Sequence, residues 1–180
     1  MTTQVESAWS RFPDYRVELV PCSLTGQVWA GEVLLAESDA CLVVTETDHE
    51  DRLYFPQSAV HWEHLAGSDH TTVCPFKGEA CYWNVTGAEA NVPNVAWSYR
   101  EPLDEVADIA GYVSFYHDVV RVVLVEQWED GSKVPTDFPL WGDAAELLRL
   151  IDVQPSGETR FIGPAHGPAD GAGEEPLLEG

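Results

Sequence analysis

The stretch from Cys74 to Gly78 contains the residue types best suited to chemistry in this chain. It reads Cys-Pro-Phe-Lys-Gly, and Lys77 is one of two lysines in the sequence, the other being Lys133. Its ammonium group could meet a carboxylate or another anionic ligand, because the neighbouring glycine lets the backbone approach closely. The alternative is a structural lysine, either exposed in a turn or buried in an ion pair.

Cys74 is a second candidate, as a nucleophile. A thiolate attacks electrophiles, and the cation of Lys77, three residues along the chain, could stabilise it. That spacing ensures contact only within a helix. The alternative is that Cys74 is a buried structural thiol, the common state of free cysteines. The sequence therefore offers two catalytic candidates, Cys74 and Lys77, without a reaction to assign to them.

Aromatic residues with polar tips recur around this stretch. Such amphipathic rings can line a pocket for an apolar or aromatic ligand. Aromatic residues on strands are also frequently part of the core. Because these rings accompany a rare lysine, we expect a ligand pocket lined by Tyr54, Lys77, Tyr82, Trp97 and Tyr99.

The histidines that precede Cys74 permit a zinc interpretation. Imidazole and thiolate groups are common zinc ligands, and His61, His64 and His70 lie within fourteen residues of the cysteine. In a strand, however, His61 and His64 would point to opposite faces, and only a turn would bring them together. We therefore predict no metal ion and no cofactor.

The elements that must position these residues are mostly strands. From Tyr15 to Gln127, short β-branched and aromatic runs alternate with turn residues, which favours an antiparallel sheet or barrel over βαβ units. The predicted strands span residues 16–21, 27–35 (with a break at Gly31), 41–45, 52–55, 71–74, 80–85, 95–99, 112–116 and 119–125. Trp97 and Tyr99 would share one strand face, by the two-residue period.

One short internal helix is predicted at 104–110, with Asp104 as its N-cap and Gly111 at its end. Beyond Trp128 the composition changes toward Pro, Gly and acidic residues. The expected organisation is an N-terminal extension (1–14), a β domain (15–127), a linker or extended segment (128–142), a helical appendage (143–164) and a disordered acidic tail (165–180).

The charge excludes several partners. Thirty-one acidic and nine basic residues give a formal net charge of −22, which repels phosphate backbones and anionic lipid surfaces. We expect neither nucleic acid nor a membrane as a partner. The first ten residues lack a signal pattern, which favours a cytoplasmic location. There, four reduced thiols are expected, since no Cys-x-x-Cys pair occurs among Cys22, Cys41, Cys74 and Cys81.

Four segments, read in order, resemble one family. They are 53–56 (LYFP), 72–83 (TVCPFKGEACYW), 96–99 (AWSY) and 109–116 (IAGYVSFY), with Pro102 before the last. Together they resemble the domain of unknown function 427 family, which sometimes carries a nucleotidyltransferase-like label, over about residues 17–125. The resemblance implies a compact antiparallel β-tent, or Mss4-like, fold.

Three observations limit what this resemblance implies for activity. Nucleotide transfer needs carboxylates that hold Mg²⁺ and donors that cradle phosphates, and no Gly-Ser with paired aspartates is present here. Some β-tent relatives bind zinc through paired Cys-x-x-Cys motifs, which this chain lacks. After Tyr-Phe-Pro the family usually has Asp-Val, whereas this chain has Ala59-Val60.

The tail carries a second resemblance. Residues 145–155 and 160–164 resemble the opening segment of the acyl-CoA thioesterase II (double hot-dog) family, in which a helix precedes the first strand. This implies a thioesterase-like protein partner or a relic of a fused enzyme, not thioesterase activity. The alternative is an ordinary amphipathic helix that docks on the β domain.

These observations favour a small-molecule binding or accessory domain. Two alternatives stay open: an enzyme that uses Cys74 or Lys77, and a non-catalytic interaction module that binds a protein through its acidic surface and helix. In the last case the partner could be a second copy of the chain.

Overall fold

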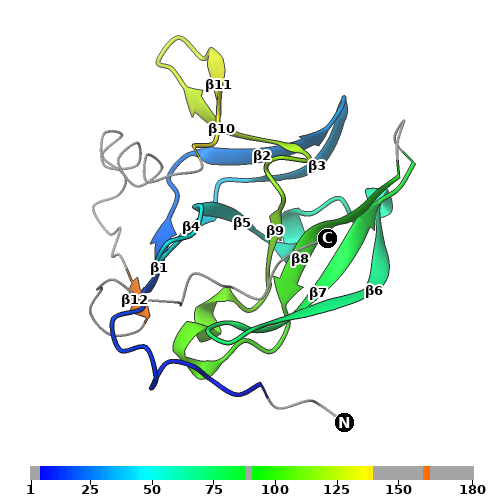
Figure 1. Ribbon diagram of the computed structural model, residues 1–180. Helices are drawn as coiled ribbons and strands as arrows, with labels where there is room; N and C mark the ends of the chain where they lie inside the picture. Colours follow the sequence, from blue (N-terminus) through cyan, green and yellow to red (C-terminus); the bar gives the residue numbers. More distant parts are fainter. Residues whose placement is uncertain (1–4, 88–90, 140–159, 163–180) are drawn as a thin grey trace.

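The computed structural model describes residues 5–87, 91–139 and 160–162 (Figure 1). As predicted, the chain is mainly β. One group of strands comprises β1 (Val17–Pro21), β4 (Leu42–Glu46), β5 (Arg52–Pro56), β6 (Leu65–Cys74), β7 (Gly78–Val85), β8 (Val92–Tyr99), β9 (Tyr112–Phe115) and β12 (Arg160–Ile162). The other comprises β2 (Thr25–Ala30), β3 (Val33–Ser38), β10 (Arg121–Gln127) and β11 (Lys133–Asp137).

These strands form two antiparallel sheets. The large sheet has the order β12-β1-β4-β5-β9-β8-β7-β6, and the small sheet has the order β11-β10-β2-β3. The small sheet lies across the upper end of the large one in Figure 1. Three 3₁₀ helices complete the described elements: η1 (Gln57–Ala59), η2 (Trp62–His64) and η3 (Asp104–Ile109).

The central strands of the large sheet are buried on both faces. Val43 belongs to a cluster shared with the small sheet, whereas Val44, the next residue, belongs to a second cluster on the opposite face. Leu53 and Tyr54 divide in the same way, because successive side chains of a strand point to opposite faces. This two-sided burial explains why the central strands are nearly continuous apolar runs.

The two clusters have different contents. The first is aliphatic and includes Phe55 and Phe115. The second is aromatic and is completed by the N-terminal segment through Trp9 and Tyr15, and by η3 through Ile109. The candidate site lies in this aromatic cluster.

Each predicted strand overlaps an observed strand, with differences in the bounds. The stretch 27–35 does break at Gly31, which has a φ of 59° and turns the chain between β2 and β3. β6 begins at Leu65, six residues before its predicted start. The internal helix is a 3₁₀ helix, and its predicted cap is wrong: Leu103 occupies the cap position, without a side-chain hydrogen bond.

Residues assigned to the linker and the appendage lie partly outside the described ranges. Within the expected linker, β11 pairs with β10 and extends the small sheet. Of the expected helical appendage, only β12 is described, as a strand that pairs with β1. The rest of the appendage and the acidic tail fall outside the described residues.

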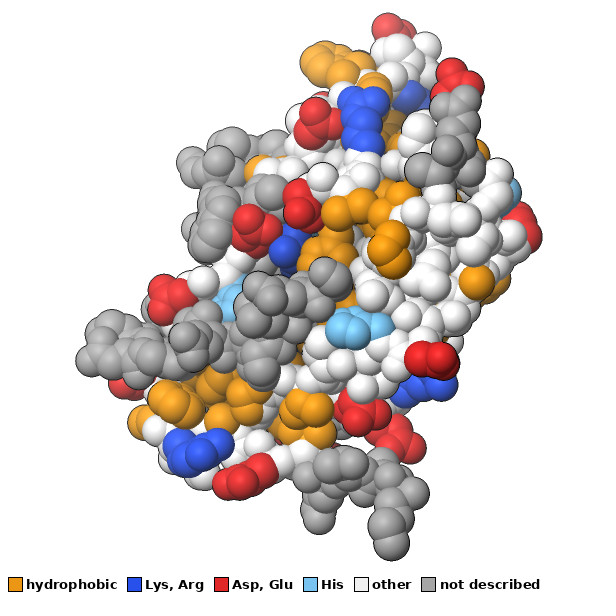
Figure 2. Space-filling view, turned by 45° about the vertical axis from the view of Figure 1, so that its right-hand side comes forward, with side chains coloured by type: hydrophobic (Ala, Val, Ile, Leu, Met, Phe, Trp, Pro, Cys, Tyr) orange, Lys and Arg blue, Asp and Glu red, His pale blue; other side chains and the backbone are white. Residues whose placement is uncertain are grey.

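Acidic side chains are spread over the molecular face in Figure 2, among fewer basic ones, in keeping with the net charge of −22. Within the described ranges, no helix has the length and apolar character needed to cross a membrane.

A glycine substitution tests the aliphatic cluster. A Cβ atom at Gly26 would lie 2.8 Å from Leu53 Cδ2 and 2.9 Å from Cys41 Sγ. Gly26→Ala should therefore lower the free energy of unfolding by about 1–3 kcal/mol, the usual cost of overpacking. Gly67→Ala is the matched control, because nothing lies within 4 Å of its Cβ position. Urea unfolding curves of equal midpoint for the two variants would contradict this packing.

Candidate functional site

A buried ion pair joins Lys77 to Glu46. The Nζ atom of Lys77 donates to Oε2 of Glu46, and the two side chains are only 4% and 5% exposed. The other carboxylate oxygen, Oε1, accepts a hydrogen bond from the hydroxyl of Tyr15. Burial, followed by the negative charge of Glu46, raises the pKa of Tyr15. Tyr15 therefore stays protonated and acts as a donor.

The turn that carries Lys77 is held by backbone contacts. The N–H of Lys77 donates to the carbonyl of Cys74 (3.3 Å), and its carbonyl accepts from the N–H of Leu103 (2.9 Å). Gly78 has a φ of 116°, and a Cβ there would lie 3.3 Å from the Glu101 carbonyl. A glycine is needed here both for its backbone conformation and for this close approach.

The N-terminal segment covers the same turn. The ring of Tyr15 stacks on Phe76 at 3.6 Å between centroids, and Trp9 meets Phe76 edge-on at 5.3 Å. The indole N–H of Trp9 donates to the carbonyl of Phe76 (3.0 Å), and the N–H of Ala8 donates to Pro75 (2.9 Å). Aromatic contacts and backbone hydrogen bonds together shield the ion pair from water.

A cavity of about 30 Å³ lies beside the pair, and we call it the Lys77 hollow. It is lined by Val44, Glu46, His49, Glu50, Arg52, Tyr54, Lys77 and Trp97. Three of the five predicted pocket residues, Tyr54, Lys77 and Trp97, thus line one hollow. The indole N–H of Trp97 donates to the hydroxyl of Tyr54 (3.2 Å), which fixes the orientation of both rings.

Arg52 is the second cation of the hollow. Its Nη2 atom lies 3.0 Å from a Glu50 carboxylate oxygen, and its guanidinium carbon lies 5.8 Å from the ring centroids of Trp97 and Tyr116. Its Nη1 atom is buried and has no hydrogen-bond partner among the described residues. A buried donor of this kind normally has an acceptor.

The other two predicted residues, Tyr82 and Tyr99, pack in the aromatic cluster without lining the hollow. The ring of Tyr99 lies 5.9 Å from the Lys77 ammonium group. The hydroxyl of Tyr82 shares a hydrogen bond of 2.8 Å with that of Thr72. All the predicted rings are almost fully buried, so they act mainly as core and leave room for only a small group.

The placement of the two catalytic candidates favours structural roles. Cys74 is 2% exposed within the aromatic cluster, so a substrate has no direct access to its thiol. The ammonium group of Lys77 is buried and paired with the carboxylate of Glu46, so it is not presented to a substrate as a nucleophile. The described cysteines are all free, and burial raises the pKa of the Cys22 thiol to about 11.

The histidines considered as zinc ligands make other contacts. His61 Nδ1 lies 3.0 Å from the Leu34 carbonyl, and the ring of His70 packs against Tyr82 at 4.7 Å. In the part of the chain that the structure describes, no three His, Cys, Asp or Glu side chains are grouped to hold a metal ion.

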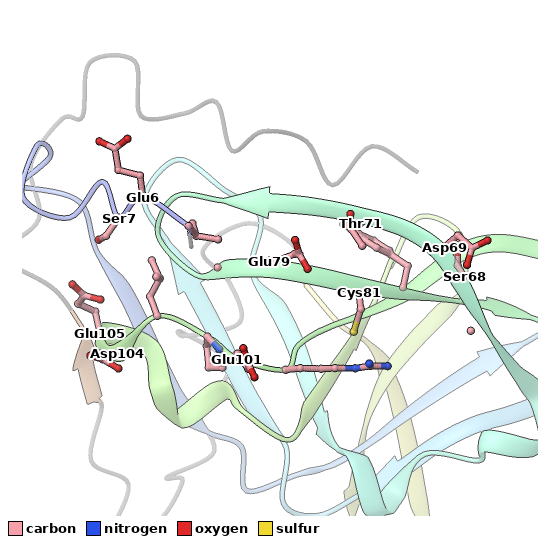
Figure 3. A pocket seen from close by; sticks show the side chains of 17 residues that line it. Glu6, Ser7, Ser68, Asp69, Thr71, Glu79, Cys81, Glu101, Asp104 and Glu105 are labelled. Atoms are coloured by element: carbon pink, nitrogen blue, oxygen red, sulfur yellow. The ribbon is translucent and has the colours of Figure 1, made fainter. Parts of the chain in front are cut away.

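A wider groove lies along the β6–β7 hairpin (Figure 3), and we call it the acidic groove. Its volume is about 1050 Å³, and Tyr82 is among its lining residues. Six carboxylates line it, with Arg100 as its one Lys or Arg: Glu6, Asp69, Glu79, Glu101, Asp104 and Glu105.

Sequence reasoning missed Glu46, Arg52 and the groove carboxylates. Glu46 and Arg52 flank a polar turn between two predicted strands, where charged residues are normally exposed. One signal pointed to Glu46: a lysine buried in an aromatic core needs a carboxylate.

Removal of one ion-pair partner tests the burial of the pair. Lys77→Met should lower the free energy of unfolding by about 3–5 kcal/mol, because Glu46 is then buried without a cation. The double variant Glu46→Leu/Lys77→Met should lose less than Lys77→Met alone. Arg121→Met is the matched control: its pair with Asp137 is exposed, and its loss should cost at most about 1 kcal/mol. Equal losses from Lys77→Met and Arg121→Met, measured by urea unfolding, would exclude a buried pair.

His117 gives the fold a pH dependence. Both its ring nitrogens are buried without a partner among the described residues, and burial, with a smaller effect of Arg52, lowers its pKa to about 3. In the unfolded chain, His117 takes up a proton as the pH falls through about 6.5, whereas in the folded protein it does so only near pH 3. This histidine therefore does not destabilise the fold above pH 6.5, and the free energy of unfolding decreases as the pH falls from 6.5 toward 3.

His117→Leu should therefore lose less stability than the wild type between pH 7.5 and pH 5, by about 2 kcal/mol. The measurement is the urea midpoint and slope at each pH. Parallel pH profiles for the two proteins would show that His117 titrates normally.

Comparison with known proteins identifies a family but no characterised relative. No curated protein matches the chain. Residues 18–126 match the family described as a domain of unknown function (DUF427). This span exceeds half of the chain and contains Glu46, Arg52, Lys77 and every predicted ring. It also confirms the resemblance carried by the Cys-Pro-Phe-Lys-Gly stretch. The resemblance to acyl-CoA thioesterase II lies almost wholly outside the described residues and stays a prediction. The chain belongs to the DUF427 family.

Proposed function

We propose that the domain binds a small molecule by admitting one hydrogen-bond-accepting group of it, a carbonyl or carboxylate oxygen, into the Lys77 hollow. One observation carries the proposal: the Nη1 atom of Arg52 is a buried donor, and this atom has no acceptor among the described residues. Arg52 lines the hollow. Lys77, Tyr54 and Trp97 line the same space.

Size and charge narrow the class of ligand. A hollow of about 30 Å³ holds a group of roughly the size of one water molecule, so the rest of the ligand would remain outside. Each cation of the hollow already faces a carboxylate, Glu46 for Lys77 and Glu50 for Arg52. A phosphate group would be repelled by these two carboxylates, because no unpaired cation of the hollow is left to neutralise it. A single carbonyl or carboxylate oxygen needs only one hydrogen-bond donor.

Access is expected from the side of His49 and Glu50. Both residues are half-buried, whereas Tyr54 and Trp97 are fully buried behind them. The ring of Trp97 and the guanidinium of Arg52 form a cation–π contact that orients the donor.

A ligand panel tests the proposal. Thermal shifts are measured with short carboxylates, primary amides, acyl-CoA thioesters and nucleotides. Ligands with an accessible carboxylate or carbonyl should stabilise the protein, by about 2.7 kcal/mol at a hundred times the dissociation constant, and nucleotide phosphates alone should not. Arg52→Met should abolish the shift. Arg16→Met is the matched control, because Arg16 pairs with Glu18 and does not line the hollow. A flat response across the panel, or an undiminished shift in Arg52→Met, would overturn the proposal.

We also propose a β-tent arrangement and a cytoplasmic location. Two antiparallel sheets with little helix support the first. Four free thiols in the described chain support the second, because such thiols persist in a reducing compartment.

A further inference from the structure

Among the described residues, no strand pairs with the outer edge of β6. β6 is the last strand of the large sheet, at its right-hand side in Figure 1, and among the described residues it pairs only with β7. Its pairing with β7 shifts register between Gly67 and Thr71, so the regular part of the edge is Thr71–Cys74.

The β6–β7 turn shows in which direction the backbone N–H and C=O groups of Thr71–Cys74 point. The carbonyl of Cys74 accepts from Lys77, on the β7 side of the strand. Because backbone groups alternate along an antiparallel strand, those of Thr72 also point toward β7, and those of Thr71 and Val73 point to the outer edge. Thr71 and Val73 are both exposed residues, and Val73 is 40% accessible to solvent.

The regular part of this edge, Thr71–Cys74, contains no charged residue and no proline, the residue types that normally prevent strand addition. Natural edge strands are protected by lysine or proline, and β11, one of the two edge strands of the small sheet, carries Lys133 and Pro135. β6 contains neither residue type. Its regular part instead reads Thr-Thr-Val, which has high strand propensity.

The acidic groove is lined by residues of both β6 and β7, and Thr71 belongs to the groove as well as to the regular edge (Figure 3). No ion pair within the described ranges involves its six carboxylates, and the guanidinium of Arg100 lies over the ring of Trp83 at 5.8 Å. A concave surface lined by one sign of charge concentrates the electrostatic potential. The groove therefore complements a basic partner.

We propose that the edge of β6 docks an extended, basic segment of another protein, which adds a strand to the large sheet. Backbone hydrogen bonds to Thr71 and Val73 would supply the pairing, and lysine or arginine side chains would reach the groove. Val73 lies opposite Glu79, so an added strand would lie about two strand spacings, roughly 10 Å, from the backbone of Glu79. A lysine or arginine side chain of the added strand and the side chain of Glu79 are together long enough to meet across this distance. A second copy of this chain is a poor occupant, because its net charge is also −22.

The test uses a fluorescent peptide of alternating lysine and valine, about eight residues long, which matches the length of a strand. Its binding to the full chain is followed by anisotropy at low salt. We expect saturable binding that weakens at least about ten-fold when alternate peptide nitrogens are methylated, since this removes the pairing donors. A peptide with glutamate in place of lysine should not bind.

Two variants place the site. Val73→Pro removes an outward N–H at a position where proline is tolerated, and it should weaken binding at least about ten-fold. Val73→Ala removes the same side chain but keeps the N–H, and it should bind nearly as the wild type does. Glu79→Lys should weaken binding and flatten its salt dependence. Glu129→Lys, with the same charge change in the β10–β11 turn far from β6, should do neither.

Three results would overturn the proposal: no binding of the basic peptide at low salt, equal affinity of the methylated and unmethylated peptides, or equal affinity of Val73→Pro and Val73→Ala. A dimer in light scattering that Val73→Pro dissociates would assign the edge to a second copy instead. If Val73→Pro fails to fold, the methylated peptide decides the question alone.

Discussion

The contact between Lys77 and Glu46 holds together three parts of the chain that are distant in sequence. It joins the β6–β7 turn to the end of β4, and Tyr15 adds the segment that enters β1. Charges out of water are tolerated only when each finds a partner and further hydrogen bonds. The stacked rings of Tyr15 and Phe76, and the backbone bonds of Ala8 and Leu103 to the turn, follow from that requirement. The aromatic cluster is thus assembled around a polar centre.

This centre also limits what the site can accept. The rings of Tyr54 and Trp97 fill the space that a larger ligand would need, and they leave a hollow of about 30 Å³. The binding proposed at the Lys77 hollow depends on one buried donor, Arg52 Nη1, whereas the binding proposed at β6 depends on a strand edge and on charge. The two proposed sites use different physical interactions and have no lining residue of the Lys77 hollow and the acidic groove in common.

Much of the fold was predictable because the two-sided burial of the large sheet leaves long apolar runs between turn residues. The first half of β6 was not, since Gly67, Ser68 and Asp69 are turn-forming residues and lie in a bulge. Tyr54, Lys77 and Trp97 could be grouped from the sequence because all three lie in the segments that resemble the family, and because lysine is rare in this chain. Arg52 could not, because a charged residue at a strand end is normally exposed. The acidic groove draws its carboxylates from separate segments, so the sequence shows only their total charge.

The division of Val43 and Val44 between two cores has a consequence for how this family can vary. Insertion or deletion of a single residue inside β4 would turn every following side chain of that strand to the opposite face of the sheet. Changes of length are therefore confined to the connecting loops, and the central strands can diverge only by substitution.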